Sequence, residues 1–190
     1  MPDRIVAGTY LAAAAITGGA IRLKNVVHYD MRPIVEKFID MGAFVTLEED
    51  AICLTAPHRL HGLGYLTTAP HPGFPTDMQP QFMAMLACSH NGTTIEETLF
   101  ESRDKHVAEL AKMGANIINR YSKFFHIKGM PQLYGATVDA ADLRGGAALV
   151  LAGLAAHGET IVQGGEYIER GYEAIHADLQ KLGADIEYIP

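Results

Sequence analysis

The chain has 190 residues, of which 48% are hydrophobic and 19% are charged, which suffices for one domain with a sizeable apolar core and excludes a disordered chain. Fifteen Lys and Arg residues against 22 Asp and Glu residues give a formal net charge of −7, which disfavours broad nucleic-acid binding. The sequence shows neither a signal peptide nor an apolar run of the roughly 20 residues that a membrane span needs. We therefore expect a cytoplasmic protein without membrane or nucleic-acid partners.

The first of three similar segments opens with an apolar run at 9–16, for which we expect a buried helix because apolar residues occupy nearly every face. After Gly18 and a short strand, a second helix is expected at 33–39. This helix is closed by Met41-Gly42-Ala43, and Gly42 fits the left-handed backbone conformation that follows many helices. A strand at 43–47 completes the segment.

The second segment repeats this plan after the stretch 55–75, which is rich in His, Gly and Pro and is expected to be irregular. Its apolar helix is expected at 81–88. Its outer helix is expected at 105–112, closed by Met113-Gly114-Ala115, and its pattern is amphipathic. The inward face of this outer helix is expected to comprise Val107, Leu110 and Ala111.

The third segment carries an apolar helix at 147–154, an outer helix at 172–181 and a strand at 184–188. In each segment one glycine follows the apolar helix and another follows the outer helix. These pairs are Gly18 and Gly42, Gly92 and Gly114, and Gly158 and Gly183. Three similarly spaced pairs indicate an internal repeat.

The repeats predict a single α/β domain over residues 1–190, with approximate units 1–70, 71–135 and 136–190. A helix that is apolar on nearly every face has to be buried, so we expect the first helices of the three units to pack together inside. The sheets are then expected on the outside.

The loop before the second apolar helix contains three prolines and ends in Thr76 and Asp77, which are expected at the start of a helix. An Asp at this position is typical of an N-cap, which accepts backbone N–H groups. A catalytic carboxylate is the alternative, and spacing does not distinguish the two.

The third apolar helix is preceded by Asp142, which also suits an N-cap, and it begins with Arg144 in its first turn. A cation there opposes the helix dipole, so it requires a compensating anion. The anion is either a ligand such as phosphate at the helix N-terminus or a salt-bridge partner, Asp142 or Asp139.

Arg103 and Arg170 occupy matching places in the second and third units, each between a strand and the outer helix. They either point into one cleft or lie on the solvated surface. Gly62-Leu63-Gly64 lacks the third glycine of a dinucleotide fingerprint, and His58 and His61 lack further ligands at a metal-site spacing. We therefore expect neither a cofactor nor a metal.

The stretch 69–79, Ala-Pro-His-Pro-Gly-Phe-Pro-Thr-Asp-Met-Gln, closely resembles a signature of the UDP-N-acetylglucosamine enolpyruvyl transferases. Further motifs of this family are matched by Asp142-Leu143-Arg144, by Arg170-Gly171-Tyr172-Glu173, and by Pro2-Asp3-Arg4-Ile5 with Gly8-Thr9. The resemblance covers essentially the whole chain in order. It implies one of two domains, each an inside-out α/β barrel of three similar units.

Enzymes of this family transfer the enolpyruvyl group of phosphoenolpyruvate to the 3′-hydroxyl of UDP-N-acetylglucosamine, by addition and elimination of phosphate, in peptidoglycan biosynthesis. The resemblance implies that Asp77 binds the sugar hydroxyl and acts as general base, as a hydroxyl that attacks must lose its proton. It also implies that Leu99 and Phe100 contact the UDP-sugar, and that Arg170 binds the phosphate of phosphoenolpyruvate. Arg144 and Arg103 would support the charged cleft.

The family's N-terminal lysine–asparagine pair and its cysteine-bearing loop, which supplies the general acid, are not found in this sequence, and neither Cys53 nor Cys88 has that context. The sequence therefore predicts the C-terminal half of the enzyme, inactive alone, with the N-terminal domain as its partner. A UDP-sugar binding or interaction module without catalysis is the alternative. Within the enzyme class the alternative is 3-phosphoshikimate 1-carboxyvinyltransferase, against which the motif at 74–79 argues.

Overall fold

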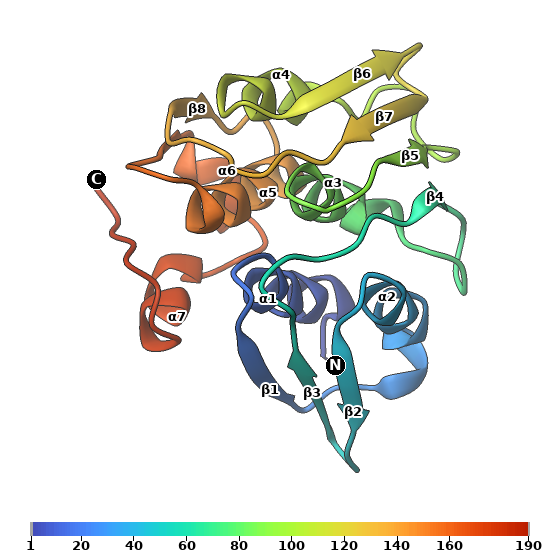
Figure 1. The fold of residues 1–190 in the computed structure, drawn as a ribbon. Coiled ribbons are helices and arrows are strands. Elements are labelled where there is room, and N and C mark those ends of the chain that lie inside the picture. Colours follow the sequence, from blue (N-terminus) through green and yellow to red (C-terminus); the bar gives the residue numbers. More distant parts are fainter. Residues whose placement is uncertain (1, 190) are drawn as a thin grey trace.

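The computed structural model describes residues 2–189, and it places three helices at the centre of the molecule with sheets around them (Figure 1). The central helices are α1 (Arg4–Ile16), α3 (Gln79–Ala87) and α5 (Leu143–Ala155), and they pack on one another. All nine residues of α3 are buried. The prediction that the apolar helices lie inside is confirmed. No helix within residues 2–189 is long and apolar enough to cross a membrane.

The first unit surrounds α1 with one outer helix and one sheet. Its further elements are β1 (Ala20–Lys24), α2 (His28–Asp40), β2 (Phe44–Leu47) and β3 (Ala51–Thr55). Strand β3 lies between β1 and β2 and pairs antiparallel with both.

The second unit repeats this arrangement around α3 and adds one strand. Its further elements are β4 (Gly64–Thr67), the 3-10 helix η1 (Thr76–Met78), β5 (Thr93–Glu96), α4 (Lys105–Lys112), β6 (Asn116–Arg120) and β7 (Phe124–Lys128). The order β5-β7-β6 repeats β1-β3-β2, and β4 pairs parallel with β5. The stretch 55–75 is therefore not wholly irregular, because β4 lies within it. The sheet of the second unit begins before the expected repeat boundary at residue 70.

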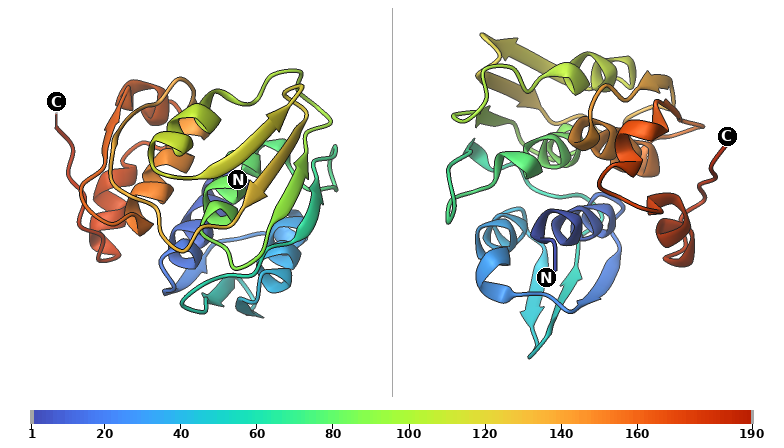
Figure 2. Two further views of the ribbon diagram at one scale, coloured as in Figure 1. Left: turned by 45° about the horizontal axis from the view of Figure 1, so that its top comes forward. Right: turned by 180° about the vertical axis from the view of Figure 1, so that it is seen from behind.

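The third unit is the shortest. Its further elements are β8 (Thr137–Asp139), β9 (Ile161–Gln163), α6 (Gly165–Glu169) and α7 (Ile175–Lys181). Strands β8 and β9 pair parallel, as β4 and β5 do. The expected strand at 184–188 is wrong: this segment is irregular, because no described strand takes the partner position that β3 and β7 fill in the other units. The two views of Figure 2 show this segment leading away from α7 to the C-terminal end.

The last outer helix begins later than the sequence predicts, at Ile175 and not at Tyr172. The aromatic ring of Tyr172 turns into the core, where only 2% of the residue is exposed. In α4 the buried face contains His106 with Val107 and Leu110, whereas Ala111, expected to face inward, is exposed. Tyr172 is buried through its contact with Thr9 of the first unit, which local periodicity does not reveal. His106 lies one turn before Leu110 on the same face of α4, so periodicity fits the observed face as well as the expected one.

The glycines after the outer helices have the expected left-handed conformation, with φ values of 92°, 90° and 100°. These glycines are Gly42, Gly114 and Gly183. In each case the next residue, an alanine, donates its N–H to a carbonyl five residues earlier, as in Ala43 to Phe38. The same helix closure occurs three times, which confirms the repeat pattern at this feature.

The C-terminal turns of the central helices line a cavity of about 270 Å³ that also contains Arg59. The guanidinium group of Arg59 donates from Nε to the carbonyl of Cys88 at 2.8 Å. From Nη2 it donates to the carbonyls of Ser89 at 2.6 Å and Met130 at 2.9 Å. A cation there satisfies carbonyls beyond the end of α3 and complements the negative end of the helix dipole.

We expect Arg59→Met to lower the free energy of unfolding by about 2–3 kcal/mol, because it removes three charge-assisted hydrogen bonds and keeps most of the apolar stem. Urea unfolding at neutral pH measures this change. The matched control is Arg32→Met, which removes an exposed arginine paired only with Glu36 and should cost less than about 0.5 kcal/mol. Equal effects of the two substitutions would contradict the structural role of Arg59.

Candidate active site

The N-terminal portions of the three central helices meet at the end of the domain opposite the Arg59 cavity. Gln81 of α3 donates from Nε2 to Oγ1 of Thr9 in α1 at 3.1 Å. The same Thr9 oxygen lies 2.8 Å from the hydroxyl of Tyr172, which accepts from Nη1 of Arg144 in α5 at 3.1 Å. Helix N-termini present unpaired N–H groups and partial positive charge, so their meeting point favours an anion.

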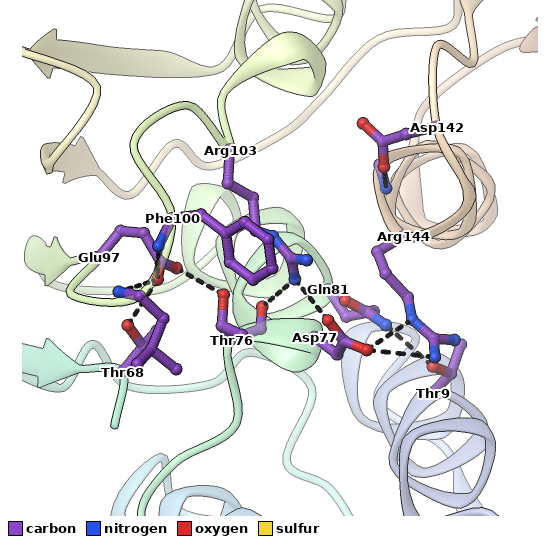
Figure 3. A network of polar contacts seen from close by, with 12 residues as sticks. Thr9, Thr68, Thr76, Asp77, Gln81, Glu97, Phe100, Arg103, Asp142 and Arg144 are labelled. Carbon is purple, nitrogen blue, oxygen red and sulfur yellow. Dashed lines mark hydrogen bonds and ion pairs between the residues drawn. The ribbon is translucent and has the colours of Figure 1, made fainter. Parts of the chain in front are cut away.

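Asp77 is the anion found at this point, and it lies between two arginines (Figure 3). Arg103 donates from Nη1 to Oδ1 at 2.7 Å. Arg144 contacts Oδ2 from Nε at 3.4 Å and from Nη2 at 3.3 Å. The arginine side chains are 17% and 15% exposed, whereas that of Asp77 is 35% exposed. The carboxylate is therefore held by both guanidinium groups and remains open to solvent on one side.

The pKa of Asp77 is lower than that of an ordinary aspartate. Burial acts most strongly and would raise this pKa, but the hydrogen bond and charge of Arg103, together with those of Arg144, outweigh it. The group is consequently ionised at neutral pH. It accepts a proton readily only where these arginines are drawn away from it.

Asp77 is not an N-cap. It lies inside η1, whose N-cap is Pro75, and no backbone N–H of residues 2–189 donates to its carboxylate. Asp142 is an N-cap, as expected, and accepts from the N–H of Gly145 at 2.7 Å. The anion that Arg144 contacts is Asp77, so the alternative of a salt bridge to Asp142 or Asp139 is wrong.

The position of Arg103 is fixed on three sides. Besides Asp77, its Nη1 donates to the carbonyl of Thr76 at 2.7 Å. The Cζ atom lies 4.2 Å from the ring centroid of Phe100, a cation–π contact. Phe100 itself is 50% exposed and Leu99 is 42% exposed, so both can meet a ligand at the edge of the site.

Arg170 makes no hydrogen bond or ion pair with this cluster, although Tyr172, two residues later, contacts Arg144. Arg170 follows α6, is exposed, and its side chain makes no hydrogen bond or ion pair with other residues in the range 2–189. The structure thus brings Asp77, Arg103 and Arg144 into direct contact, with Phe100 beside them, whereas Arg170 shares no hydrogen bond or ion pair with them.

Sequence reasoning missed Tyr172 and Glu97. The Tyr172 hydroxyl holds Arg144 and connects it to the buried Thr9. Glu97 is 2% exposed and accepts hydrogen bonds from the hydroxyls of Thr68 and Thr76. No sequence signal pointed to Glu97, because Glu in a Glu-Glu pair at a strand end is ordinarily exposed. Tyr172 could have been found from its place inside the Arg-Gly-Tyr-Glu motif.

Neither cysteine contacts Asp77, Arg103 or Arg144 in the described part of the chain. Cys88 follows the C-terminal end of α3, about 13 Å of helix from its start, and burial raises the pKa of its thiol to about 11. Cys53 lies on β3, and a hydrogen bond to Glu48 raises the pKa of its thiol. Both thiols are therefore poor sources of a proton donor for chemistry at Asp77.

Comparison with known proteins defines the class. A family model described as EPSP synthase (3-phosphoshikimate 1-carboxyvinyltransferase) matches residues 1–179, and the chain belongs to this family. The enolpyruvyl transferase NikO from Streptomyces tendae superposes with a TM-score of 0.85 at 26% identity, covering 98% of this chain and 44% of that one. EPSP synthase from Acinetobacter baumannii has a TM-score of 0.73 at 21% identity, covering 98% of this chain and 43% of that one. The expected inside-out α/β fold is confirmed.

More specific similarity comes from curated relatives named UDP-N-acetylglucosamine 1-carboxyvinyltransferase. The protein of Zymomonas mobilis is 47% identical over 189 residues, covering 100% of this chain and 44% of the relative. That of Synechocystis is 48% identical over 189 residues, covering 100% of this chain and 43% of the relative. The chain thus spans less than half the length of the relatives it matches.

Asp77→Asn keeps the shape of the side chain but leaves two largely buried guanidinium groups without their anion. We expect it to lower the free energy of unfolding by about 1–2 kcal/mol at pH 7, a value discounted because Asp77 is partly exposed. The pKa of Asp77 is lower in the folded than in the unfolded chain, so this stabilisation is present above about pH 5 and is lost as the pH falls below about 4. Urea unfolding at several pH values measures it.

The matched control is Asp185→Asn, which removes an exposed carboxylate that makes no side-chain hydrogen bond within residues 2–189. This control should not change stability at any of these pH values. A loss of stability in Asp77→Asn that is as large at pH 3 as at pH 7 would show that the carboxylate charge is not responsible.

Proposed function

We propose that this chain supplies the Asp77-bearing half of a transferase that moves the enolpyruvyl group of phosphoenolpyruvate to the 3′-hydroxyl of UDP-N-acetylglucosamine, in peptidoglycan biosynthesis. The observation that carries the proposal is the carboxylate of Asp77, held between two guanidinium groups where three helix N-termini meet. Relatives of 47% and 48% identity bear the name of this activity, which supports the choice of substrate.

Asp77 is proposed as the general base. When the sugar hydroxyl attacks C2 of phosphoenolpyruvate, a C–O bond forms and the hydroxyl proton has to leave. Asp77 is ionised and one side of it is open to solvent, so it can receive this proton once the arginines are drawn away from it. C3 of phosphoenolpyruvate gains a proton in this addition. The later elimination removes a proton from C3, breaks the C–O bond to phosphate and restores the double bond between C2 and C3.

Arg103 and Arg144 are proposed to stabilise the anionic substrate. Forked guanidinium donors suit both the carboxylate and the phosphate of phosphoenolpyruvate. An anion that accepts hydrogen bonds from these arginines draws their N–H donors away from Asp77. The loss of these donors raises the pKa of the Asp77 carboxylate, which makes it a stronger base. Arg170 remains the candidate for the phosphate group, and its exposed side chain is free of competing partners within residues 2–189.

Leu99 and Phe100 are proposed to contact the UDP-sugar. They lie on the loop between β5 and α4. Figure 3 shows Phe100 on the side of Arg103 away from Arg144. The proton donor for phosphoenolpyruvate is expected from the N-terminal domain, because neither cysteine contacts Asp77 within residues 2–189 and the pKa of each thiol is raised.

Transfer to 3-phosphoshikimate is the alternative within the class, and the description of the family model names it. Sequence identity favours UDP-N-acetylglucosamine, since EPSP synthase of Acinetobacter baumannii is 21% identical, against 47% for the relative from Zymomonas mobilis.

We expect no phosphate release from phosphoenolpyruvate and UDP-N-acetylglucosamine by the chain alone, and release when an N-terminal half of this family is added as a separate polypeptide. In the active mixture Asp77→Asn should lower kcat by about 10²–10⁴-fold, the range for loss of a general base. A phosphate assay on each half and on the mixture measures both effects.

The control in the mixture is Asp185→Asn, which should leave the rate unchanged. Turnover by the chain alone would overturn the expectation that it is incompetent. An inactive mixture of folded, associated halves that still binds UDP-N-acetylglucosamine would favour the alternative function, a binding module without catalysis.

A further inference from the structure

Glu97 is a buried acidic group that makes no ion pair with any residue in the range 2–189. Its two carboxylate oxygens accept four hydrogen bonds. Oε1 accepts from the hydroxyl of Thr68 at 2.9 Å and from the backbone N–H groups of Leu99 at 2.9 Å and Phe100 at 3.3 Å. Oε2 accepts from the hydroxyl of Thr76 at 2.8 Å. A buried carboxylate without a cation is tolerated only where its oxygens are satisfied in this way.

The contacts of Oε1 fix the backbone of Leu99 and Phe100. Both side chains extend outward from this anchored turn and are about half exposed. The ring of Phe100 in turn lies against the guanidinium group of Arg103. The orientation of Arg103 therefore depends on a turn that Glu97 holds.

The contact of Oε2 fixes the other side of the same guanidinium group. The carbonyl of Thr76, the residue whose hydroxyl donates to Glu97, accepts from Nη1 of Arg103 at 2.7 Å. The next residue is Asp77, which accepts from the same nitrogen. One carboxylate thus connects the aromatic and the carbonyl contacts of Arg103 (Figure 3).

We infer that Glu97 is a positioning residue that joins the exposed Leu99–Phe100 turn to the Asp77–Arg103 ion pair. A ligand that contacts this turn then alters the pKa of Asp77 through the buried side chain of Glu97. The part of the inference that concerns a nucleotide sugar rests on the proposed function, whereas the positioning of Arg103 on Asp77 is a property of the chain without substrate.

A purely structural role is the competing explanation, in which Glu97 closes the loop after β5 and nothing more. Such a role predicts a change in stability without a change in the ionisation of Asp77. A positioning role predicts that Asp77 loses part of the influence of Arg103, so its pKa rises toward the ordinary value.

The first experiment is a carbon-13 NMR titration of the Asp77 carboxyl group in the 190-residue chain. Glu97→Leu removes all four acceptor contacts, and Glu97→Gln keeps one acceptor oxygen. We expect the pKa of Asp77 to rise in both, more in Glu97→Leu. The matched control is Glu96→Gln, which should leave this pKa unchanged. Within residues 2–189 the Glu96 carboxylate contacts only Tyr65 and Lys123.

Glu97→Leu leaves buried N–H groups unpaired and can prevent folding, so two other variants decide the outcome in that case. These are Glu97→Gln and Phe100→Leu, the latter removing the exposed ring against Arg103 while the backbone contact with Glu97 remains. An unchanged pKa of Asp77 in both folded variants would overturn the positioning role.

The second experiment is calorimetric titration of the chain with UDP-N-acetylglucosamine. We expect Glu97→Gln to weaken binding by about tenfold and Glu96→Gln to have no effect. If the wild-type chain binds no nucleotide sugar, the proposed function fails, whereas the NMR titration still decides whether Glu97 positions Arg103 on Asp77. Equal binding affinity of Glu97→Gln and wild type would show that Glu97 does not influence the nucleotide-sugar site.

Discussion

The burial of three helices that are apolar on nearly every face determines the rest of this structure. Such helices cannot face water on any side, so α1, α3 and α5 cover one another and the amphipathic helices and sheets cover them. Since the three helices also run in the same direction, their N-terminal ends meet at one end of the domain and their C-terminal ends at the other. The domain therefore has one end that attracts anions and one that attracts cations.

The charged side chains follow this polarity. An aspartate stands at the start of each central helix: Asp3, Asp77 and Asp142. Asp3 and Asp142 cap their helices by accepting backbone N–H groups. Asp77 instead accepts hydrogen bonds from two arginines. At the opposite end of the domain, Arg59 donates to carbonyls beyond α3. One aspartate of three thus pairs with side chains and not with backbone N–H groups, because its helix begins with a 3-10 turn that it does not cap.

Features that depend on local sequence were predictable, and features that depend on contacts between units were not. The apolar helices and the glycines that close the outer helices follow from periodicity and from backbone conformation at Gly42, Gly114 and Gly183. The late start of α7 was missed, because it results from burial of Tyr172 against α1 and α5. The loss of regular structure at 184–188 was missed because a strand needs a partner that the sequence of that segment does not specify.

The candidate site shows the same division. The motif at 69–79 singled out Asp77, and the misfit of Arg144 with its helix dipole correctly indicated a nearby anion. That this anion is Asp77 could not be deduced, because 67 residues separate the two in sequence. Glu97 could not be predicted for a related reason. Its carboxylate is satisfied by four hydrogen-bond donors from two separate segments, and no sequence pattern in those segments indicates a buried acidic residue.

The pairing of Asp77 with two arginines also has a consequence for the order of events at the site. Their charges keep the carboxylate ionised and weakly basic, so proton abstraction is disfavoured while both guanidinium groups remain on it. An anionic ligand competes for the same donors, and each hydrogen bond it takes makes Asp77 a stronger base. Basicity would thus develop only with an anion bound. The half-exposed Phe100, which lies on Arg103 and is anchored by Glu97, provides a second route by which an adjacent ligand can alter that balance.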